Sequence, residues 1–326
     1  MFYYLIYLKQ WLVAHGWITL AGAEWLSPLR IFGYITFRAL AGAAMAFLVS
    51  VLVGPWLIRR LRELKIGQIE RTEHVGAVGE MHKGKAGTPT MGGLLIVVSV
   101  TLATLLWSPP NFFILLTLGS FVFLGMVGFL DDYLKLRQRH SRGLPARMKF
   151  GLQVAWGVIV ALMLLSWPGT HEHVRQLMLP MLKQPAIADL GMPLTILLVV
   201  LVIVGSSNAV NLTDGLDGLA IGCTSSAALA YMVMAYAAGH VLFAEYLNVP
   251  HVIGCGELTV FCGCLLGGSL GFLWYNCHPA QVFMGDTGSL ALGGAIAVVA
   301  LLIKQEVTLI VVGGVFVIEA LRVILQ

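Results

Sequence analysis

Long apolar runs recur from one end of the 326-residue chain to the other, and many approach the roughly 20 residues that a helix needs to cross a bilayer. Only 11% of the residues are charged, whereas a soluble domain carries about a quarter. Backbone polar groups inside lipid must be satisfied within the protein, which favours helices. The runs therefore predict an all-α, polytopic integral membrane protein that forms a single domain over residues 1–326.

Nine membrane-spanning helices are expected from these runs. Residues 1–17 are apolar and aromatic but lack the basic start of a secretory signal, so they predict an interfacial helix before the first span. The predicted spans cover residues 31–57, 91–107, 112–130, 150–167, 192–207, 219–238, 258–275, 290–303 and 307–326.

The basic residues indicate the orientation of the chain. Thirteen of the 20 Lys and Arg residues fall in two loops, 58–90 and 131–149, which follow the first and third predicted spans. Cytoplasmic loops carry an excess of Lys and Arg. We therefore expect both loops in the cytoplasm and the N-terminus on the outer side.

Five of the six aspartates follow the third, fifth and seventh spans, which are predicted to end at the cytoplasmic face. An ionisable group at membrane depth costs at least about 2.5–3.5 kcal/mol, so such a group indicates a functional site by default. Because only basic residues were used to assign the sides, the agreement is independent. We expect these carboxylates to converge at the inner face: Asp131, Asp132, Asp214, Asp217 and Asp286.

The densest polar stretch is residues 208–218, NAVNLTDGLDG, directly after the fifth predicted span. In the simplest interpretation it is a turn in which Asp214 and Asp217 cap the next helix. Capping needs one residue, whereas this stretch supplies two asparagines and two aspartates. The excess favours a ligand-binding role.

The motif DDYLK closes the third predicted span. Adjacent helical residues point about 100° apart, so Asp131 and Asp132 would face different surroundings. Lys135 lies four residues beyond Asp131, on the same helix face, where it would keep that carboxylate ionised. Taken alone, the motif is equally compatible with a solvated helix end and a weak surface ion pair.

Asp286 stands between two glycines in the segment 283–289, FMGDTGS, before the eighth predicted span. Glycine lets a backbone approach a ligand closely, and the N–H groups that begin a helix favour a phosphate. The alternative is that Asp286 only caps this helix, and the two roles are compatible.

The segment 83–93, KGKAGTPTMGG, precedes the second predicted span. Thr88 and Pro89 suit a helix start, and the two final glycines permit close helix packing. These structural roles leave Lys85 and Thr90 as contacts for an anionic ligand. The segment is not a P-loop, because it lacks the Gly-Lys-Ser/Thr ending.

Carboxylates near lysines favour a Mg²⁺-assisted phosphate reaction. Mg²⁺ binds through one or two carboxylates and completes its coordination with water and substrate phosphates. The cysteines and histidines do not form a set with zinc spacing. His278 is the histidine of most interest because it lies close to Asp286 in the sequence.

Four motifs, in order and over nearly the whole chain, resemble the bacterial phospho-N-acetylmuramoyl-pentapeptide-transferases. These enzymes belong to the polyprenyl-phosphate N-acetylhexosamine-1-phosphate transferase superfamily. The matching segments are TPTMGG at 88–93, DDYLK at 131–135, NAVNLTDGLDG at 208–218 and FMGD at 283–286.

The resemblance implies a phosphotransferase of peptidoglycan synthesis and cell-wall biogenesis. It would transfer phospho-N-acetylmuramoyl-pentapeptide from UDP-MurNAc-pentapeptide to undecaprenyl phosphate with Mg²⁺, which gives lipid I and UMP. The expected location is the bacterial cytoplasmic (inner) membrane, with the active site on the cytoplasmic face. A homodimer in the lipid bilayer is expected, and no nucleic-acid partner.

The resemblance also implies roles for individual residues. Asp286 would be the Mg²⁺ ligand and a catalytic residue. Asp131 and Asp132 match the family's catalytic pair, one of them a base or nucleophile. Phe283 would stack on uracil. The implied nucleotide- and substrate-binding residues are Lys85, Thr90, Asn211, Asp214, Asp217, Asn276 and Phe283.

Residues 1–326 contain no counterpart of the family's histidine-rich loop and tenth helix, so we expect a chain that is C-terminally truncated relative to the family. One alternative is a UDP-N-acetylglucosamine-1-phosphate transferase, which runs the same reaction without a peptide. Another is a membrane transporter, which would place an acid near the centre of a span. Glu319 is the clear candidate for such an acid, but no inverted repeat is visible.

Overall fold

A computed structural model describes residues 2–15, 21–63, 88–138, 143–180, 182 and 184–325. This part of the chain is almost entirely helical, which confirms the predicted fold class. Seven of its helices are long and apolar enough to cross a membrane. They are α2 (Ile35–Glu63), α5 (Phe112–Gln138), α6 (Ala146–Ser166), α8 (Gly191–Thr213), α9 (Leu219–Gly239), α11 (Leu258–Asn276) and α12 (Gly285–Leu302).

Two further predicted spans differ from these seven. The second corresponds to the shorter apolar helix α4 (Gly93–Trp107). The segment predicted as a ninth span, 307–326, is not one continuous helix, because α13 (Leu309–Val312) and α14 (Gly314–Leu325) are separated at Gly313. Two consecutive glycines at this break have low helix propensity, which explains why the apolar pattern alone was misleading.

Three helices extend beyond the ends that hydropathy predicts. Helix α5 continues through Asp131 and Asp132, α8 continues through Asn208 and Asn211, and α12 begins at Gly285. The prediction ended each span where the apolar run ends. In the structure these polar side chains have hydrogen-bond partners on neighbouring helices, which offset the cost of placing them beyond the apolar residues.

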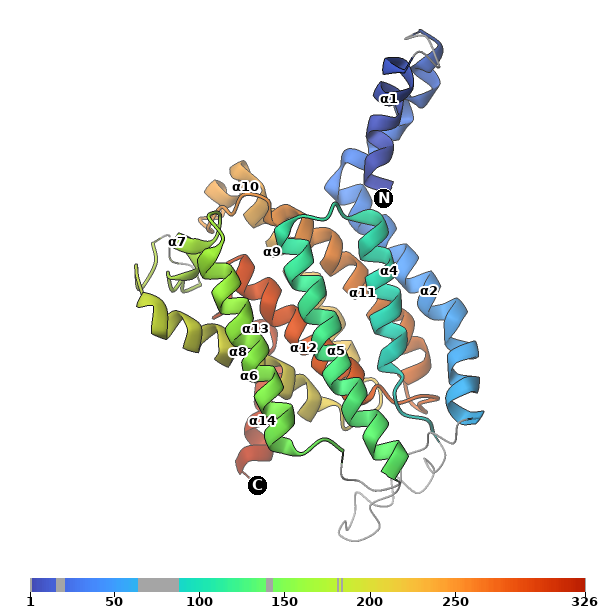
Figure 1. Cartoon of the computed structure of the whole chain (residues 1–326), viewed down its shortest axis with the longest axis vertical. Helices are drawn as coiled ribbons and strands as arrows, with labels where there is room; N and C mark the ends of the chain where they lie inside the picture. The colour runs from blue at the N-terminus through green and yellow to red at the C-terminus, as the bar shows by residue number, and fades with distance from the viewer. Residues whose placement is uncertain are drawn as a thin grey trace.

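Helices α11 and α12 form the centre of the bundle, and nearly every residue of α12 is buried. Around them stand α2, α4, α5, α8 and α9 (Figure 1). Glycines set the spacing of α11 against α2, because a Cβ at Gly263 would come within 2.6 Å of the Ala39 carbonyl oxygen. Small residues at such interfaces let helix backbones approach closely.

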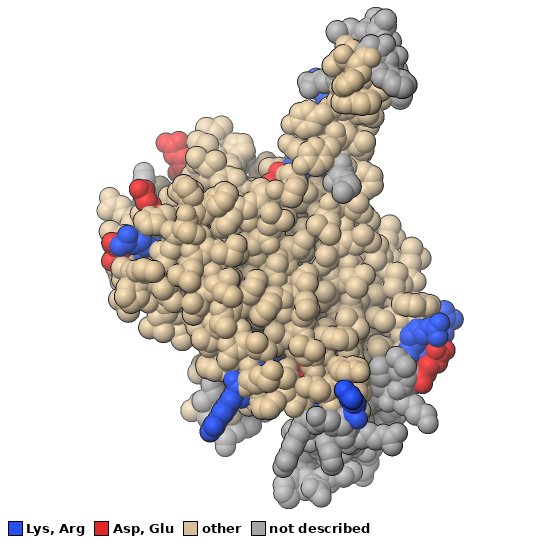
Figure 2. Space-filling model, in the orientation of Figure 1, with Lys and Arg blue, Asp and Glu red and all other residues tan. Residues whose placement is uncertain are grey.

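On the face shown in Figure 2, charged side chains gather near the two ends of the molecule, and the surface between them is uncharged. At the end where α2 begins, Arg38 is only 1% exposed and donates to both carboxylate oxygens of Glu257, at 2.6 and 2.7 Å. At the same end, just beyond α12, Lys304 Nζ lies 2.7 Å from Glu306 Oε1. Lys304 and Glu306 are both buried, whereas Glu257 is partly exposed. We call this end of the bundle the α2-start end.

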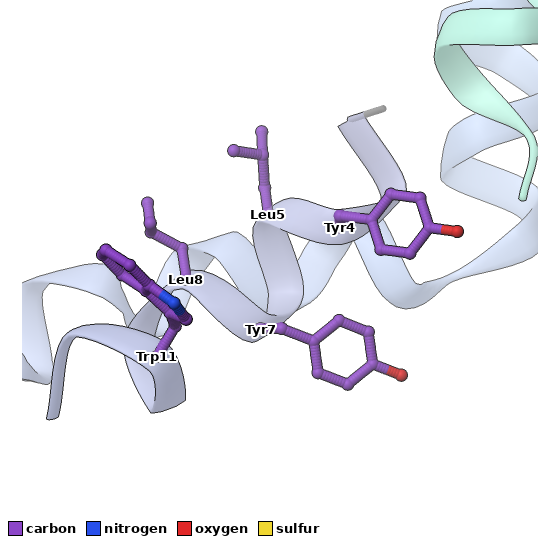
Figure 3. A pocket seen from close by; sticks show the side chains of 5 residues that line it. All are labelled: Tyr4, Leu5, Tyr7, Leu8 and Trp11. Atoms are coloured by element: carbon purple, nitrogen blue, oxygen red, sulfur yellow. The ribbon is translucent and has the colours of Figure 1, made fainter. Parts of the chain in front are cut away.

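The N-terminal segment projects from the bundle at this end (Figure 1). It consists of η1 (Phe2–Tyr7), α1 (Leu8–Ala14) and η2 (Ala21–Gly33). An open pocket of about 260 Å³ lies on its aromatic side chains, far from the aspartate-rich end of the bundle (Figure 3). The Arg38 guanidinium stacks over the Tyr3 ring at 4.8 Å from its centroid and so links this segment to the bundle.

Candidate active site

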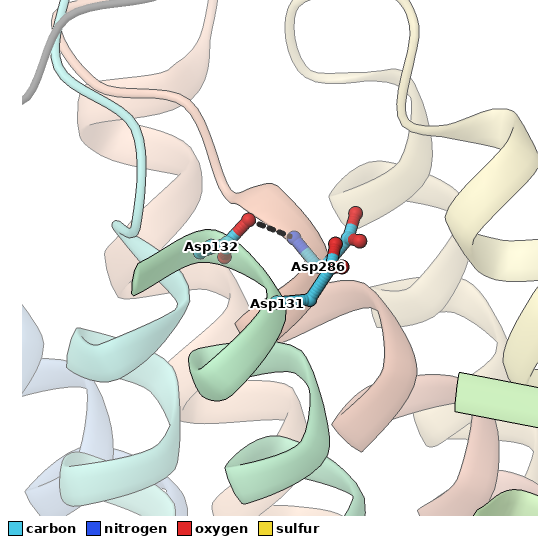
Figure 4. A group of neighbouring side chains, drawn as sticks. All are labelled: Asp131, Asp132 and Asp286. Atoms are coloured by element: carbon cyan, nitrogen blue, oxygen red, sulfur yellow. Dashed lines mark hydrogen bonds between the residues drawn. The ribbon is translucent and has the colours of Figure 1, made fainter. Parts of the chain in front are cut away.

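Three carboxylates meet at the opposite end of the bundle. Asp131 and Asp132 come from α5 and Asp286 from the first turn of α12 (Figure 4). One oxygen of each carboxylate lies within 4.8 Å of the others. The predicted convergence of these three aspartates is therefore confirmed. We call this group the acid cluster.

Asp286 is held by side chains from three other helices. Its Oδ2 accepts hydrogen bonds from Lys135 Nζ of α5 at 3.0 Å and Lys149 Nζ of α6 at 2.7 Å. Its Oδ1 accepts one from Asn211 Nδ2 of α8 at 2.8 Å, and the same amide nitrogen lies 2.8 Å from Ser289 Oγ. These contacts fix the carboxylate at the junction of α5, α6, α8 and α12.

Asp131 is tied to its own helix and to the following loop. Lys135 Nζ lies 2.5 Å from Asp131 Oδ2, so the expected pair one turn apart is present. Leu144 N–H donates to Asp131 Oδ1 at 2.7 Å. Since Lys135 also contacts Asp286, one ammonium group bridges two carboxylates.

Asp132 caps helix α12 from outside that helix. Its carboxylate accepts from the backbone N–H groups of Asp286 at 3.3 Å and Thr287 at 3.0 Å, and from Thr287 Oγ1 at 2.8 Å. A carboxylate at this position satisfies free N–H groups and complements the helix dipole. The cap of α12 is thus Asp132 rather than Asp286, which leaves the Asp286 side chain directed at the lysines.

Glycines bring α12 against α4 and α5 at this point. A Cβ at Gly93 would overlap the backbone of Gly288, and one at Gly128 would overlap the Asp286 carbonyl. Gly285 has a φ of +74°, and a Cβ there would lie 2.7 Å from Asp132 Oδ2. The backbone at the FMGD motif thus lies close to protein atoms, which serves helix packing and the Asp132 cap, and the predicted approach to a ligand stays a prediction.

The segments around Thr90 and Phe283 lie side by side. Phe283 N–H donates to the Pro89 carbonyl at 2.8 Å, and Gly92 N–H donates back to the Phe283 carbonyl at 2.8 Å. Thr90 Oγ1 is a neighbour of Gly285, so this predicted site residue lies beside the acid cluster. Lys85 lies outside the described residues.

The loops after α8 and α11 are joined by Asn276 and Asp217. Asn276 accepts a hydrogen bond from Gly218 N–H at 3.1 Å and donates to the Val282 carbonyl at 2.9 Å. Asp217 Oδ2 lies 3.1 Å from His278 Nδ1, so the contact of His278 is with Asp217 rather than Asp286. These predicted site residues hold the loops together beside the cluster.

Asp214 ends α8 next to the acid cluster. Burial raises the pKa of its carboxyl to about 8, and the nearby charges of Asp286 and Asp132 act in the same direction, against a backbone hydrogen bond from Gly285.

Lys149 is the contact that sequence reasoning missed. It stands in the first turn of α6 and was grouped only with the basic loop residues. Its place after a proline, at the start of a span on the aspartate-rich side, was the available signal. Nothing in the sequence indicates which turn of α6 faces Asp286.

The donor set of the acid cluster fits a hard divalent cation. Three carboxylates face two ammonium groups, which leaves a formal excess of one negative charge. All the ligand atoms are oxygens, which suits Mg²⁺ better than a softer metal. Asp131, Asp132 and Asp286 are the residues that could hold such an ion; Asp132 and Asp286 each accept three hydrogen bonds, those of Asp132 from the start of α12 and those of Asp286 from side chains of three other helices.

Comparison with known proteins places the chain among membrane transferases. Residues 113–304 match the model of glycosyl transferase family 4, and residues 85–97 match signature 1 of the phospho-N-acetylmuramoyl-pentapeptide-transferases. The similar proteins include the phospho-N-acetylmuramoyl-pentapeptide-transferase of Opitutus terrae, 47% identical over 93% of this chain and 82% of that protein. Those of Koribacter versatilis and Desulfotalea psychrophila are 45% and 50% identical, over 100% and 91% of this chain and 86% and 80% of their own lengths.

Proposed function

Since this chain belongs to the phospho-N-acetylmuramoyl-pentapeptide-transferases of glycosyl transferase family 4, we propose that it transfers phospho-N-acetylmuramoyl-pentapeptide from UDP-MurNAc-pentapeptide to undecaprenyl phosphate. The products are lipid I and UMP. The chain is thus a membrane-embedded phosphotransferase of peptidoglycan synthesis. The names of its relatives favour this reaction over both the N-acetylglucosamine alternative and a transporter.

The arrangement around Asp286 is the observation that carries the proposal at the level of the site. Three helices aim Lys135, Lys149 and Asn211 at one carboxylate, while Asp131 stands beside it. Transfer of a phosphoryl group needs positioning and charge compensation more than covalent chemistry from the protein. A fixed carboxylate with two adjacent ammonium groups supplies both.

We infer that Mg²⁺ binds at Asp286, with Asp131 offering a second carboxylate oxygen. When bound, the ion would offset the charge of the diphosphate. The excess negative charge and the all-oxygen donor set support this assignment. The two lysines carry their charge to the same place, where they would attract and orient the phosphates of both substrates.

Asp131 is the better candidate for the base or nucleophile of the aspartate pair. All three hydrogen bonds that Asp132 accepts come from the start of α12, so its oxygens are committed to that helix. Asp131 is held through a loop N–H and through Lys135, and neither contact ties it to α12. We assign Asp132 the task of fixing α12, and with it Asp286.

The nucleotide is proposed to bind over the joined segments beside the cluster. Thr90 and Phe283 lie on two of these segments, and we propose that Phe283 stacks on uracil. Asn276 and Asp217 would shape this surface by holding its loops together. Lys85 and Asp214 remain predicted contacts of the nucleotide-sugar.

The proposed location of the site is the cytoplasmic face of the bacterial inner membrane. Basic residues of α2 and α5 lie at the same end as the acid cluster, which supports this side. Both substrates fit the location, since a nucleotide-sugar is soluble and a polyprenyl phosphate lies in lipid. A homodimer remains a prediction from the resemblance.

Exchange of labelled UMP tests the reaction and its substrate. The purified protein should incorporate label into UDP-MurNAc-pentapeptide when undecaprenyl phosphate is present, and chelation of Mg²⁺ should stop it. UDP-N-acetylglucosamine is the matched control substrate. Exchange into the control alone would overturn the proposal in favour of the peptide-independent transferase.

A further inference from the structure

A pair of amide side chains, one fully buried and one partly buried, joins α6 to α8 one turn away from the acid cluster. Asn208 Nδ2 donates to Gln153 Oε1 at 2.7 Å and to the Val204 carbonyl at 2.8 Å. The carbonyl can only accept, so the Asn208 nitrogen is fixed there, and Gln153 must present its oxygen. Gln153 is fully buried in the bundle.

The Gln153–Asn208 pair lies in the interface between α6 and α8, as do Lys149 and Asn211, the two side chains of these helices that hold Asp286. Gln153 is one turn beyond Lys149 on α6, and Asn208 is one turn before Asn211 on α8, so each amide shares a helix face with one of them. One turn further along α6, a Cβ at Gly157 would lie 3.1 Å from Val200 Cα of α8. The close helix contact at Gly157 brings the two backbones near enough for the amides to meet.

We propose that Gln153 and Asn208 are positioning residues, whose hydrogen bond fixes the register of α6 against α8 and so aims Lys149 and Asn211 at Asp286. The inference rests on the proposed function for its effect on turnover. Less than a third of α6 is buried. Trp156 ties this helix to α5 through Ser120, whereas the amide pair acts directly between α6 and α8. Each residue of axial slip shifts a helix by about 1.5 Å and rotates it by about 100°, which would move the Lys149 ammonium off the Asp286 carboxylate.

The chemistry of the pair favours a role in register over a role in stability. Gln153 Nε2 is buried and has no hydrogen-bond partner among the described residues. A buried donor without an acceptor costs free energy, and an apolar pair of similar shape would avoid that cost. Apolar contacts, however, tolerate axial slip, whereas a single amide pair in an apolar seam specifies one register.

The experiment compares four variants by Lys149 reactivity, turnover and melting temperature. Gln153→Leu and Asn208→Leu remove one partner each, the double Leu variant removes both, and the swapped variant Gln153→Asn with Asn208→Gln restores an amide pair of the same total length. An amine-reactive reagent, read by mass spectrometry, reports the exposure of the Lys149 amine without requiring activity. Lys135 on α5 is the internal reference.

Both single variants should raise Lys149 labelling severalfold relative to Lys135 and lower kcat by about 10- to 100-fold, with a smaller change in KM, because misplacement by an ångström has that effect. The double Leu variant should regain the melting temperature but not the turnover. The swapped variant should recover most of both labelling protection and kcat.

Ser120→Ala is the matched control, because Trp156 Nε1 of α6 donates to Ser120 Oγ of α5 at 3.1 Å, away from the seam with α8. This variant should lower the melting temperature and leave Lys149 labelling unchanged. Unchanged labelling in both single Leu variants, or wild-type kcat in the double Leu variant, would overturn the inference. Raised labelling in a protein whose wild type lacks UMP exchange would support the positioning role and refute the proposed function alone.

Discussion

The two ends of the bundle bury charge in different ways. At the α2-start end, each described buried cation has one acid: Arg38 binds Glu257 through two hydrogen bonds, and Lys304 binds Glu306. At the other end, three carboxylates share two lysines within a few ångströms. Balanced pairs are enough for helix packing, whereas a cluster with an excess of carboxylates has room for a further cation. The comparison therefore separates charges that hold the fold from charges arranged for chemistry.

Asp286→Asn is the sharpest test of the acid cluster, in which three carboxylates share two lysines. We expect turnover to fall by at least about 10³-fold, because the loss of the metal ligand removes several kcal/mol of transition-state stabilisation. The melting temperature should stay near that of the wild type, since the change leaves two carboxylates facing two ammonium groups and the amide keeps the shape of the side chain. UMP exchange over a Mg²⁺ titration measures the effect. Wild-type rates in saturating Mg²⁺ would contradict the metal assignment.

Glu257→Gln tests the α2-start end, where each described buried cation has one acid. Removal of one partner leaves Arg38 buried without a counter-charge, so the free energy of unfolding should fall by about 3–5 kcal/mol. Turnover of the folded fraction should be unchanged, because the pair lies at the opposite end from the acid cluster. Thermal unfolding in detergent and exchange per folded protein give the two readouts. A loss of turnover without a loss of stability would break the comparison.

Asp131→Ala and Asp132→Ala sharpen the division of labour inside the cluster. Both should lower turnover by about 10²-fold or more, the range for loss of a general acid or base or of its support. Asp132→Ala alone should also destabilise the fold by about 1–2 kcal/mol, because it removes the cap of α12. Parallel melting curves distinguish the two. Near-normal turnover in one of the two variants would mean that only the other aspartate is needed for catalysis.

The smallest effect is expected for Lys304→Met combined with Glu306→Leu. Replacement of a buried pair by apolar residues of similar volume is often neutral or stabilising, so the change in unfolding free energy should stay within about 1 kcal/mol. Glu306 Oε2 has no hydrogen-bond partner among the described residues, which favours this outcome. The single variant Lys304→Met is the control and should be clearly less stable. A large loss of stability in the double variant would show that the Lys304–Glu306 pair contributes more than apolar packing could replace.

The sequence was sufficient for features that depend on local composition. The apolar runs predicted eight of the helices, and the charge distribution predicted that Asp131, Asp132 and Asp286 would meet. The exact helix ends were not predictable, because α8 continues through Asn208 and Asn211, whose partners lie on other helices and cannot be found from the local sequence. The helix break at Gly313 was missed because the apolar run continues on both sides of it, so hydropathy gives no sign that the helix ends there.

Contacts set by the rotation of one helix against another were beyond the sequence. Gln153 is one polar residue in an apolar run, and its role depends on Asn208, 55 positions away. Lys149 is one of many basic residues on its side of the membrane, and only the packing of α6 selects it. The aspartates were easier to find, because a carboxylate at membrane depth is costly in any packing.

The glycines around the start of α12 bear on how loss-of-function variants of such a chain are interpreted. At Gly93, Gly128 and Gly288 even one added methyl group would push helix backbones apart, although none of the three has a side chain that could take part in chemistry. In a saturation scan these positions would score as severely as the aspartates themselves. A map of intolerant residues would therefore outline the spacing of three helices as well as the reacting groups, and only biochemical measurements on folded variants would separate the two.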